Sequence, residues 1–333
     1  MTDSPDEIAR ALKAFIEARA PGRGAVTVTG LRPAPGGAST ENWFFDADWG
    51  ADQGSGPAPL MLRRAPRSEV VLVDRAAEFA ILEHLNDRPV PSPRAWWQGK
   101  LGGRFAMVLE RCTGRASRMV LTERNRMGLD APARLALARQ FTDILADLHQ
   151  QDMPDAPEGN PAETALAPYI ARAASMEDEV AAELRLGLWW LRENIPASSG
   201  RAVVHGDYRP ANILVHDGQV SAVLDWEFAH AGDPAEDIGW YLADVYRRQH
   251  FIPGQFEPAD FLARYEARRG VTLDRAALAW WAVFALQKLA TIAVETLQAF
   301  LAGDDSRILQ SPDRHLAALM RAVARDGKLV GVT

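Results

Sequence analysis

The chain has 333 residues, of which 47% are hydrophobic and 24% are charged, a balance close to the average of soluble globular proteins. At this length two lobes that share a cleft are expected, because a single hydrophobic core becomes inefficient. The net charge of −7 argues against a nucleic-acid partner, since such proteins usually gather excess Lys and Arg on one surface.

The first hundred residues predict an antiparallel sheet flanked by helices. Apolar residues recur at helical spacing over residues 6–20, where Pro21-Gly22 ends the pattern. Short β-like runs, separated by stretches rich in Gly, Pro and Ser, are followed by a helical pattern and one more buried strand. In chain order these segments are 25–29, 43–48, 60–63, the helix 74–85 and the strand 104–109. We expect a five-stranded sheet and a helix that carries Glu78.

Beyond Cys112 the sequence changes to long helical patterns, at residues 131–150, 161–194 and 276–302. We therefore expect an α+β protein with an N-terminal lobe, 1–112, a connection near 110–113, and a larger, mainly α-helical lobe, 113–333. The last of these patterns is the most apolar segment. It contains Gln287, Lys288 and Glu295, so it indicates a buried helix rather than a membrane span.

The cellular compartment is suggested by the N-terminus and by cysteine usage. The N-terminus is acidic and amphipathic, where a secretory signal would have a basic start and an unbroken apolar stretch. The cytoplasm is therefore expected. The single cysteine, Cys112, cannot form an internal disulfide, and no Cys/His cluster indicates a structural zinc site. The oligomeric state stays open.

A β-hairpin is predicted within residues 203–240. Two β-rich runs, 213–215 and 220–224, are joined across His216-Asp217-Gly218-Gln219, and Asp-Gly between apolar runs is a strong hairpin signal. Asp207 and Asn212 precede the hairpin, and Asp225 follows its second strand. Antiparallel pairing would bring the three side chains to one end of the hairpin.

Converging Asp, Asn and Asp oxygens suit Mg²⁺, which prefers hard oxygen ligands and keeps water and substrate phosphates in its shell. Phosphoryl transfer also needs a carboxylate that orients the attacking hydroxyl and accepts its proton. The alternative is that Asp207 and Asp225 only cap turns. That alternative suits a lone aspartate better than it suits the joint pattern.

The motifs HGDYRPANIL and LDWE, with GDPAEDIGW after them, are similar to the motifs of aminoglycoside phosphotransferases and related choline-kinase-like enzymes. The resemblance implies a protein-kinase-like two-lobe fold and an ATP-dependent kinase that phosphorylates an alcohol group, with GTP not excluded. It implies that Asp207 is the catalytic base and that Asn212 and Asp225 are magnesium ligands. It further implies that Asp237 and His205 brace the catalytic loop.

The same resemblance places nucleotide binding in the N-terminal lobe. The Gly-rich segment between the first two strands would let backbone amides approach phosphate oxygens, although its composition is also that of an ordinary turn. Its candidate residues are Gly36, Gly37, Ala38 and Ser39.

Arg63 stands where related kinases have a Lys that holds the α- and β-phosphates, and Glu78 matches the helix partner of that Lys. Arg is larger than Lys and does not simply replace it. The alternative is a surface Arg–Glu pair. The resemblance also implies that backbone groups of Glu110 and Cys112 bind adenine, whereas Cys112 lacks a His companion that would make it a nucleophile.

The acceptor is the least determined part. Trp189, Trp190, Trp280 and Trp281 are more often core residues than ligand platforms. The hydroxyl-bearing acceptor could be an aminoglycoside or a non-antibiotic metabolite such as a hydroxyacyl thioester. The segment WWAVFALQKLA resembles the branch of the family that includes fusions to acyl-CoA dehydrogenase-like domains, which favours the metabolite. A catalytically silent kinase-like protein is the rival interpretation, and a protein kinase is disfavoured by the short gap between Asp225 and Asp237.

Overall fold

A computed structural model describes most of the chain as two compact units. The described residues are 4–20, 25–34, 40–49, 57–66, 74–153, 158–176, 178–303 and 311–332. One unit comprises Met1–Arg88 and Ser92–Thr113, and the other Pro89–Pro91 and Gly114–Thr333.

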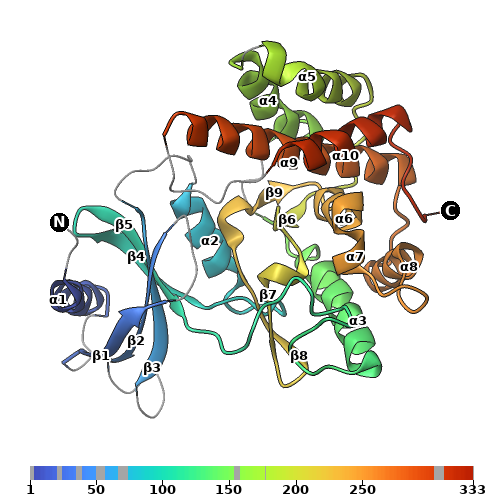
Figure 1. The fold of residues 1–333 in the computed structure, drawn as a ribbon. Helices are drawn as coiled ribbons and strands as arrows, with labels where there is room; N and C mark the ends of the chain where they lie inside the picture. The colour runs from blue at the N-terminus through green and yellow to red at the C-terminus, as the bar shows by residue number, and fades with distance from the viewer. Residues whose placement is uncertain are drawn as a thin grey trace. The chain divides into compact units, whose positions relative to one another are not determined.

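The N-terminal unit contains a five-stranded antiparallel sheet with the strand order β1-β2-β3-β5-β4 (Figure 1). Its elements are α1 (Pro5–Glu17), β1 (Thr27–Pro33), β2 (Glu41–Asp48), β3 (Ala58–Arg64), α2 (Arg75–Leu85), β4 (Ala95–Leu101) and β5 (Arg104–Glu110). The five predicted strands are thus present, four of them close to segments that the alternation of apolar residues indicated.

Helix α1 packs against one face of this sheet. Ser4 caps the helix, since its hydroxyl accepts a hydrogen bond from Glu7 N while the Glu7 carboxylate accepts one from Ser4 N. The buried stripe of α1, which includes Leu12, joins sheet residues such as Phe45 and Leu62 in one hydrophobic cluster. Burial of this stripe, more than helix propensity, holds α1 on the sheet.

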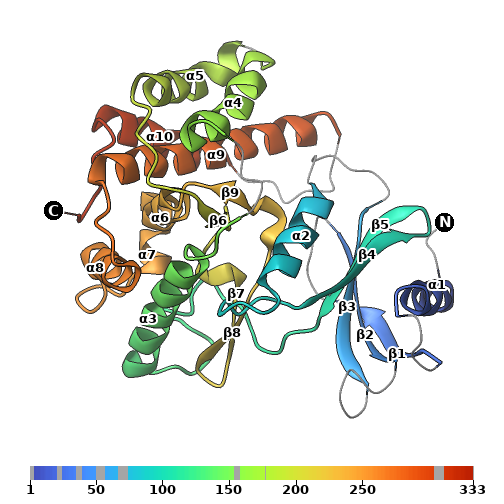
Figure 2. The same ribbon diagram turned by 180° about the vertical axis from the view of Figure 1, so that it is seen from behind.

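The C-terminal unit is mainly helical and holds two small two-stranded sheets, in which β6 pairs with β9 and β7 with β8 (Figure 2). Its helices are α3 (Ala131–Leu148), α4 (Pro161–Ala174), α5 (Asp178–Glu193), α6 (Ala235–Leu242), α7 (Arg247–His250), α8 (Pro258–Arg269), α9 (Arg275–Leu301) and α10 (Asp313–Ala324). Its strands are β6 (Ala202–Val204), β7 (Ile213–His216), β8 (Gln219–Val223) and β9 (His230–Gly232). The helical pattern at 161–194 is therefore two helices, α4 and α5, and not one.

Helix α9 forms the centre of this unit and contacts α4, α5, α6 and α10. By length and composition alone it could cross a membrane, yet 83% of its most apolar stretch is buried inside the protein. Trp280 and Trp281 are buried in it, as is Trp190 of α5, whereas Trp189 is 57% exposed. Gly239 of α6 allows the close packing, because a Cβ there would lie 2.5 Å from the Trp281 Cβ.

Candidate active site

The β7–β8 hairpin brings the predicted catalytic residues together. Ile213 pairs with Val223, and Leu224 N donates a hydrogen bond to Asn212 O at 2.7 Å, so the residue before Asp225 is fixed beside Asn212. Asp225 directly follows with φ 66° and ψ 59°, a left-handed conformation that Asp tolerates better than most residues. Asn212 Nδ2 donates to Asp207 Oδ2 at 2.8 Å.

Asp207 is a buried carboxylate with a mixed electrostatic environment. Burial raises its pKa above the ordinary value, the Arg209 guanidinium opposes this shift, and the Asp225 charge adds to it. Arg209 Nε lies 2.9 Å from Oδ1 of Asp207. Among the described residues, however, that oxygen accepts no well-aligned hydrogen bond. A carboxylate in this state is a better proton acceptor than an exposed aspartate.

Asp237 of α6 holds the backbone of the loop that carries Asp207. Its carboxylate accepts hydrogen bonds from His205 N at 2.7 Å and Gly206 N at 2.8 Å. It also accepts one from His149 Nε2 at 3.2 Å. Burial opposes the charge of Asp237, but the hydrogen bond and charge of His149 and the hydrogen bond from the backbone hold its pKa below the ordinary value. Asp237 therefore acts on the loop backbone.

His205 is also engaged by the backbone on both ring nitrogens. Nε2 donates to Leu224 O at 2.9 Å, because a carbonyl can only accept, and Nδ1 accepts from Asp207 N at 3.2 Å. The ring also contacts the Trp226 ring, with 4.6 Å between centroids. With both nitrogens occupied, His205 links the two sides of the site as a brace.

Gly206 fits this loop because of its conformation and its surroundings. Its φ is +76°, and a Cβ at this position would lie 2.6 Å from the Phe228 carbonyl oxygen. Both facts exclude a side chain without rearrangement. Its carbonyl accepts a hydrogen bond from Lys288 Nζ of α9 at 2.7 Å.

In the N-terminal unit, Arg63 of β3 pairs with Glu78 of α2 through Nη1 and Oε1. The Glu78 side chain is 0% exposed and that of Arg63 is 11% exposed. The pair is therefore not the surface pair that was the alternative. The candidate residues Gly36, Gly37, Ala38 and Ser39 lie outside the described part of the chain.

Glu110 and Cys112 lie at the end of the N-terminal unit. Glu110 N donates to Arg94 O at 2.8 Å, so this amide is already used within the unit. Burial and the neighbouring Glu110 charge raise the pKa of the Cys112 thiol to about 12. The thiol is therefore protonated near neutral pH and is a poor nucleophile.

Three residues of the site were not singled out from the sequence. Arg209 stands inside the HGDYRPANIL motif and was within reach of a sequence argument. His149 contacts Asp237, which lies 88 residues further along the chain, and Lys288 contacts the loop at Gly206, 82 residues away; spacing along the sequence carries no signal over such separations. A lone Lys in the apolar pattern of α9 was the only hint of the second.

Comparison with known proteins shows the family of this chain. A sequence model of the phosphotransferase enzyme family matches residues 30–284, which is more than half of the chain. The chain therefore belongs to this family. The resemblance drawn from the HGDYRPANIL and LDWE motifs is confirmed.

Two curated relatives are much longer than this chain. Acyl-CoA dehydrogenase family member 11 of Rattus norvegicus is 26% identical over 333 residues, which cover 89% of this chain and 40% of that protein. Acyl-CoA dehydrogenase family member 10 of Mus musculus is 23% identical over 205 residues, or 58% of this chain and 19% of that protein.

Among solved structures, a thermostable mutant of aminoglycoside phosphotransferase APH(4)-Ia is similar, with a TM-score of 0.60 and 16% identity. The match covers 97% of this chain and 100% of that one, which was solved in ternary complex with AMP-PNP and hygromycin B. At this identity the likeness shows the fold. The predicted α+β, protein-kinase-like fold is confirmed.

Proposed function

We propose that this phosphotransferase-family protein is a small-molecule kinase, which transfers the γ-phosphoryl group of a magnesium-bound nucleoside triphosphate to a hydroxyl group of its acceptor. The observation that carries the proposal is the meeting of Asp207, Asn212 and Asp225 at one end of the β7–β8 hairpin. A rival silent protein would not need all three.

Asp207 is the catalytic base in this proposal. The acceptor hydroxyl oxygen attacks the γ-phosphorus, the bond to the bridging oxygen of the nucleoside diphosphate breaks, and the hydroxyl proton passes to Asp207. Two features support this role: burial raises the pKa of the carboxyl group, and Oδ1 accepts no well-aligned hydrogen bond among the described residues. Arg209 and Asn212 orient the carboxylate.

The residues present fit a magnesium ion. The amide nitrogen of Asn212 is engaged with Asp207, which leaves the amide oxygen of Asn212 for a cation. With Asp225 this gives the small set of oxygen ligands that Mg²⁺ takes when substrate phosphates complete its shell. Within the described residues, no three His, Cys, Asp or Glu side chains gather into a metal site. When bound, magnesium neutralises the phosphate charge.

The nucleotide donor, ATP with GTP not excluded, is assigned to the N-terminal unit. The buried Arg63–Glu78 pair supports a role for Arg63 at the α- and β-phosphates, because the carboxylate fixes the guanidinium in one orientation. The segment 36–39 is the proposed phosphate contact. The Glu110 carbonyl and the backbone of Cys112 are the proposed adenine contacts, since the Glu110 amide already donates to Arg94 O. The AMP-PNP complex of the APH(4)-Ia mutant is consistent with this assignment.

Replacement of Arg63 is expected to affect both nucleotide binding and stability. Arg63→Ala leaves the Glu78 carboxylate, which is fully buried, without this partner, and such a loss costs about 3–5 kcal/mol of unfolding free energy. We also expect the affinity for magnesium–ATP to fall about tenfold or more. Urea unfolding and calorimetric titration measure the two effects.

The double variant Arg63→Met/Glu78→Leu separates these effects, because apolar residues can replace a buried ion pair with little loss of stability. We expect it to recover most of the unfolding free energy while nucleotide affinity stays low. Recovery of nucleotide affinity together with stability would mean that the pair is only structural.

The proposed function is tested by nucleotide consumption over a panel of hydroxyl-bearing metabolites and aminoglycosides, with magnesium present. We expect at least one acceptor to increase consumption above the background hydrolysis. Binding of nucleotide without consumption for any acceptor would support the silent kinase-like alternative.

Asp225→Asn tests the metal ligand. The amide tolerates the left-handed backbone at this position but lacks the negative charge, so we expect magnesium-dependent ATP affinity to fall about tenfold or more. Calorimetric titrations with and without magnesium give the result. The matched control is Asp217→Asn, since Asp217 is exposed and lies at the turn of the same hairpin with φ 48°. Unchanged magnesium dependence in Asp225→Asn would remove Asp225 from the ligand set.

A further inference from the structure

A pocket of about 240 Å³ lies within the C-terminal unit, beside the loop that carries Asp207. Residues of α4, α6, α9 and β9 line it, together with Arg201 and Phe228. This volume is below the roughly 300–1,000 Å³ of drug-sized sites, so the pocket suits a small ligand or one end of a larger ligand.

Lys288 is the most unusual group of this pocket. It is 5% exposed, and its ammonium donates to the Gly206 carbonyl. In the part of the chain that the structure describes, no carboxylate forms an ion pair with it. The Phe228 and Trp240 rings lie 4.7 and 5.2 Å from Nζ and offset part of the desolvation cost. A buried cation is normally paired with an opposite charge, whereas this ammonium contacts a neutral carbonyl and two aromatic rings.

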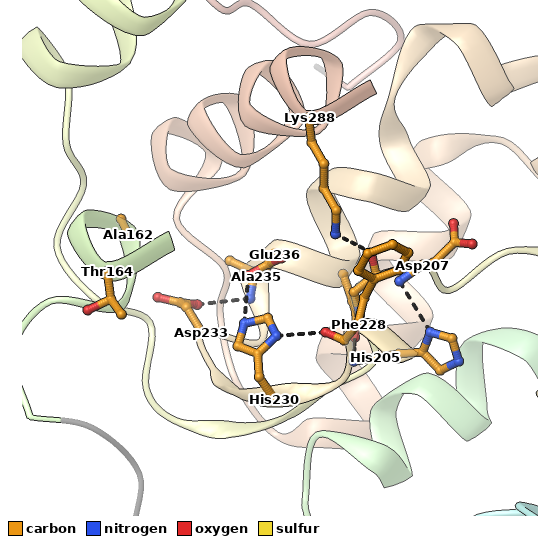
Figure 3. Close-up of polar contacts among 12 residues, drawn as sticks. Ala162, Thr164, His205, Asp207, Phe228, His230, Asp233, Ala235, Glu236 and Lys288 are labelled. Carbon is orange, nitrogen blue, oxygen red and sulfur yellow. Dashed lines mark hydrogen bonds and ion pairs between the residues drawn. The ribbon is translucent and has the colours of Figure 1, made fainter. Parts of the chain in front are cut away.

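His230 is also positively charged near neutral pH. Its Nε2 lies 3.2 Å from a Glu236 oxygen and its Nδ1 lies 2.9 Å from the Phe228 carbonyl oxygen (Figure 3). Both neighbours can only accept, so both ring nitrogens donate. Burial opposes this charge, yet the Glu236 carboxylate outweighs it and raises the pKa of His230 to about 9.

The charges that line the pocket therefore sum to a positive value. Glu236 balances His230, whereas Lys288 and Arg201 are not balanced by any other carboxylate in the lining. Arg201 is exposed and uses Nη2 to donate to Gly159 O. The edge-to-face pair of Tyr169 and Phe284, with 5.3 Å between centroids, adds an aromatic wall. A polycationic aminoglycoside would meet repulsion here.

We propose that this pocket binds a carboxylate or phosphate group of a small molecule, held by Lys288 Nζ with Arg201 and His230 nearby. The group belongs either to the acceptor itself, which would then be an anionic hydroxy compound, or to a separate effector. Figure 3 shows Lys288 reaching from α9 toward the loop of Asp207. The acceptor arm rests on the proposed kinase function, and the binding arm does not.

The binding arm is calorimetric titration of the full-length protein, without nucleotide, with inorganic phosphate and 3-hydroxybutanoate. The neutral 1,3-butanediol and the cationic kanamycin serve as matched non-binders. We expect both anions to bind to the wild-type protein. We expect Lys288→Met to lower the affinity for both anions about tenfold or more, as loss of a hydrogen bond to a charged group does. Lys100→Met, at an exposed site in β4, should leave their binding unchanged.

Arg201→Gln provides a second variant, because Arg201 is exposed and its replacement should not prevent folding. We expect weaker anion binding at an unchanged melting temperature. If neither anion binds, or if Lys288→Met lowers only the melting temperature, the ammonium merely supports Gly206 and the proposal is overturned.

The acceptor arm measures magnesium–ATP consumption with the same compounds. Consumption with 3-hydroxybutanoate but not with the diol assigns the anion to the acceptor. Anion binding without consumption, while another compound is phosphorylated, assigns it to an effector. If none of the compounds increases ATP consumption, the proposed kinase function is contradicted. The proposed anion site is not, because the binding experiment tests it without nucleotide.

Discussion

Asp207→Asn is expected to lower kcat by about 10²–10⁴-fold, the usual contribution of general acid–base catalysis, with little change in nucleotide affinity. The amide keeps the shape of the carboxylate, and its oxygen can still accept the hydrogen bond that Asn212 Nδ2 now donates to Asp207. The loop should therefore keep its structure while the proton acceptor is lost. Steady-state rates on the acceptor found by screening, with calorimetric titration of magnesium–ATP, measure both quantities.

The control for this substitution is Asp217→Asn, which makes the same chemical change at an exposed residue of the same hairpin. We expect its kcat to remain at the wild-type value. Wild-type turnover in Asp207→Asn would show that another group accepts the proton. A loss of nucleotide affinity as large as the loss of kcat would place Asp207 at the nucleotide instead.

Asp237→Ala is expected to be strongly destabilising. The substitution removes the acceptor for two buried backbone amides, His205 N and Gly206 N, and for His149 Nε2. Loss of a buried charged partner costs about 3–5 kcal/mol. Because the freed amides belong to the loop of Asp207, kcat should fall as well, even in the fraction that remains folded. Urea unfolding followed by circular dichroism gives the free energy, and rates corrected for the folded fraction give kcat.

Asp147→Ala is the comparison for this prediction, because Asp147 of α3 pairs with Arg268 of α8 in a partly exposed ion pair. Pairs of this kind contribute about 0–1 kcal/mol, so its unfolding free energy should stay near the wild-type value. Equal destabilisation by the two substitutions would contradict the bracing role of Asp237.

Much of the fold could be predicted from local pattern. Helix α1 and the β7–β8 hairpin follow from apolar periodicity and from the Asp-Gly turn, because each depends on interactions between residues close in the chain. The division of residues 161–194 into α4 and α5 did not follow, because both halves carry the same helical period.

The site was predicted unevenly for a similar reason. The motif predicts that Asp207, Asn212 and Asp225 lie close together, because all three stand within 19 residues of sequence around one hairpin. Their proposed roles stay predictions until the variants are measured. The Arg63–Glu78 pair was expected from the family resemblance, whereas its burial was not, since sequence does not show how much solvent reaches a side chain.

The sequence by itself determined the family, the change from a sheet-containing N-terminal part to a mainly helical C-terminal part, and the polar residues that end the β7–β8 hairpin, because all of these depend on short-range patterns and on a contiguous motif. Only the tertiary structure decided which distant groups support that motif. Helix α3 brings His149 to Asp237, and α9 brings Lys288 to the Gly206 carbonyl. Contacts over 80 residues or more of chain depend on how whole helices pack, and side-chain spacing along one segment does not contain that information. Lys288 forms no ion pair with a described carboxylate because the fold places its ammonium against the Gly206 carbonyl and the Phe228 and Trp240 rings, and the proposed anion site rests on that arrangement.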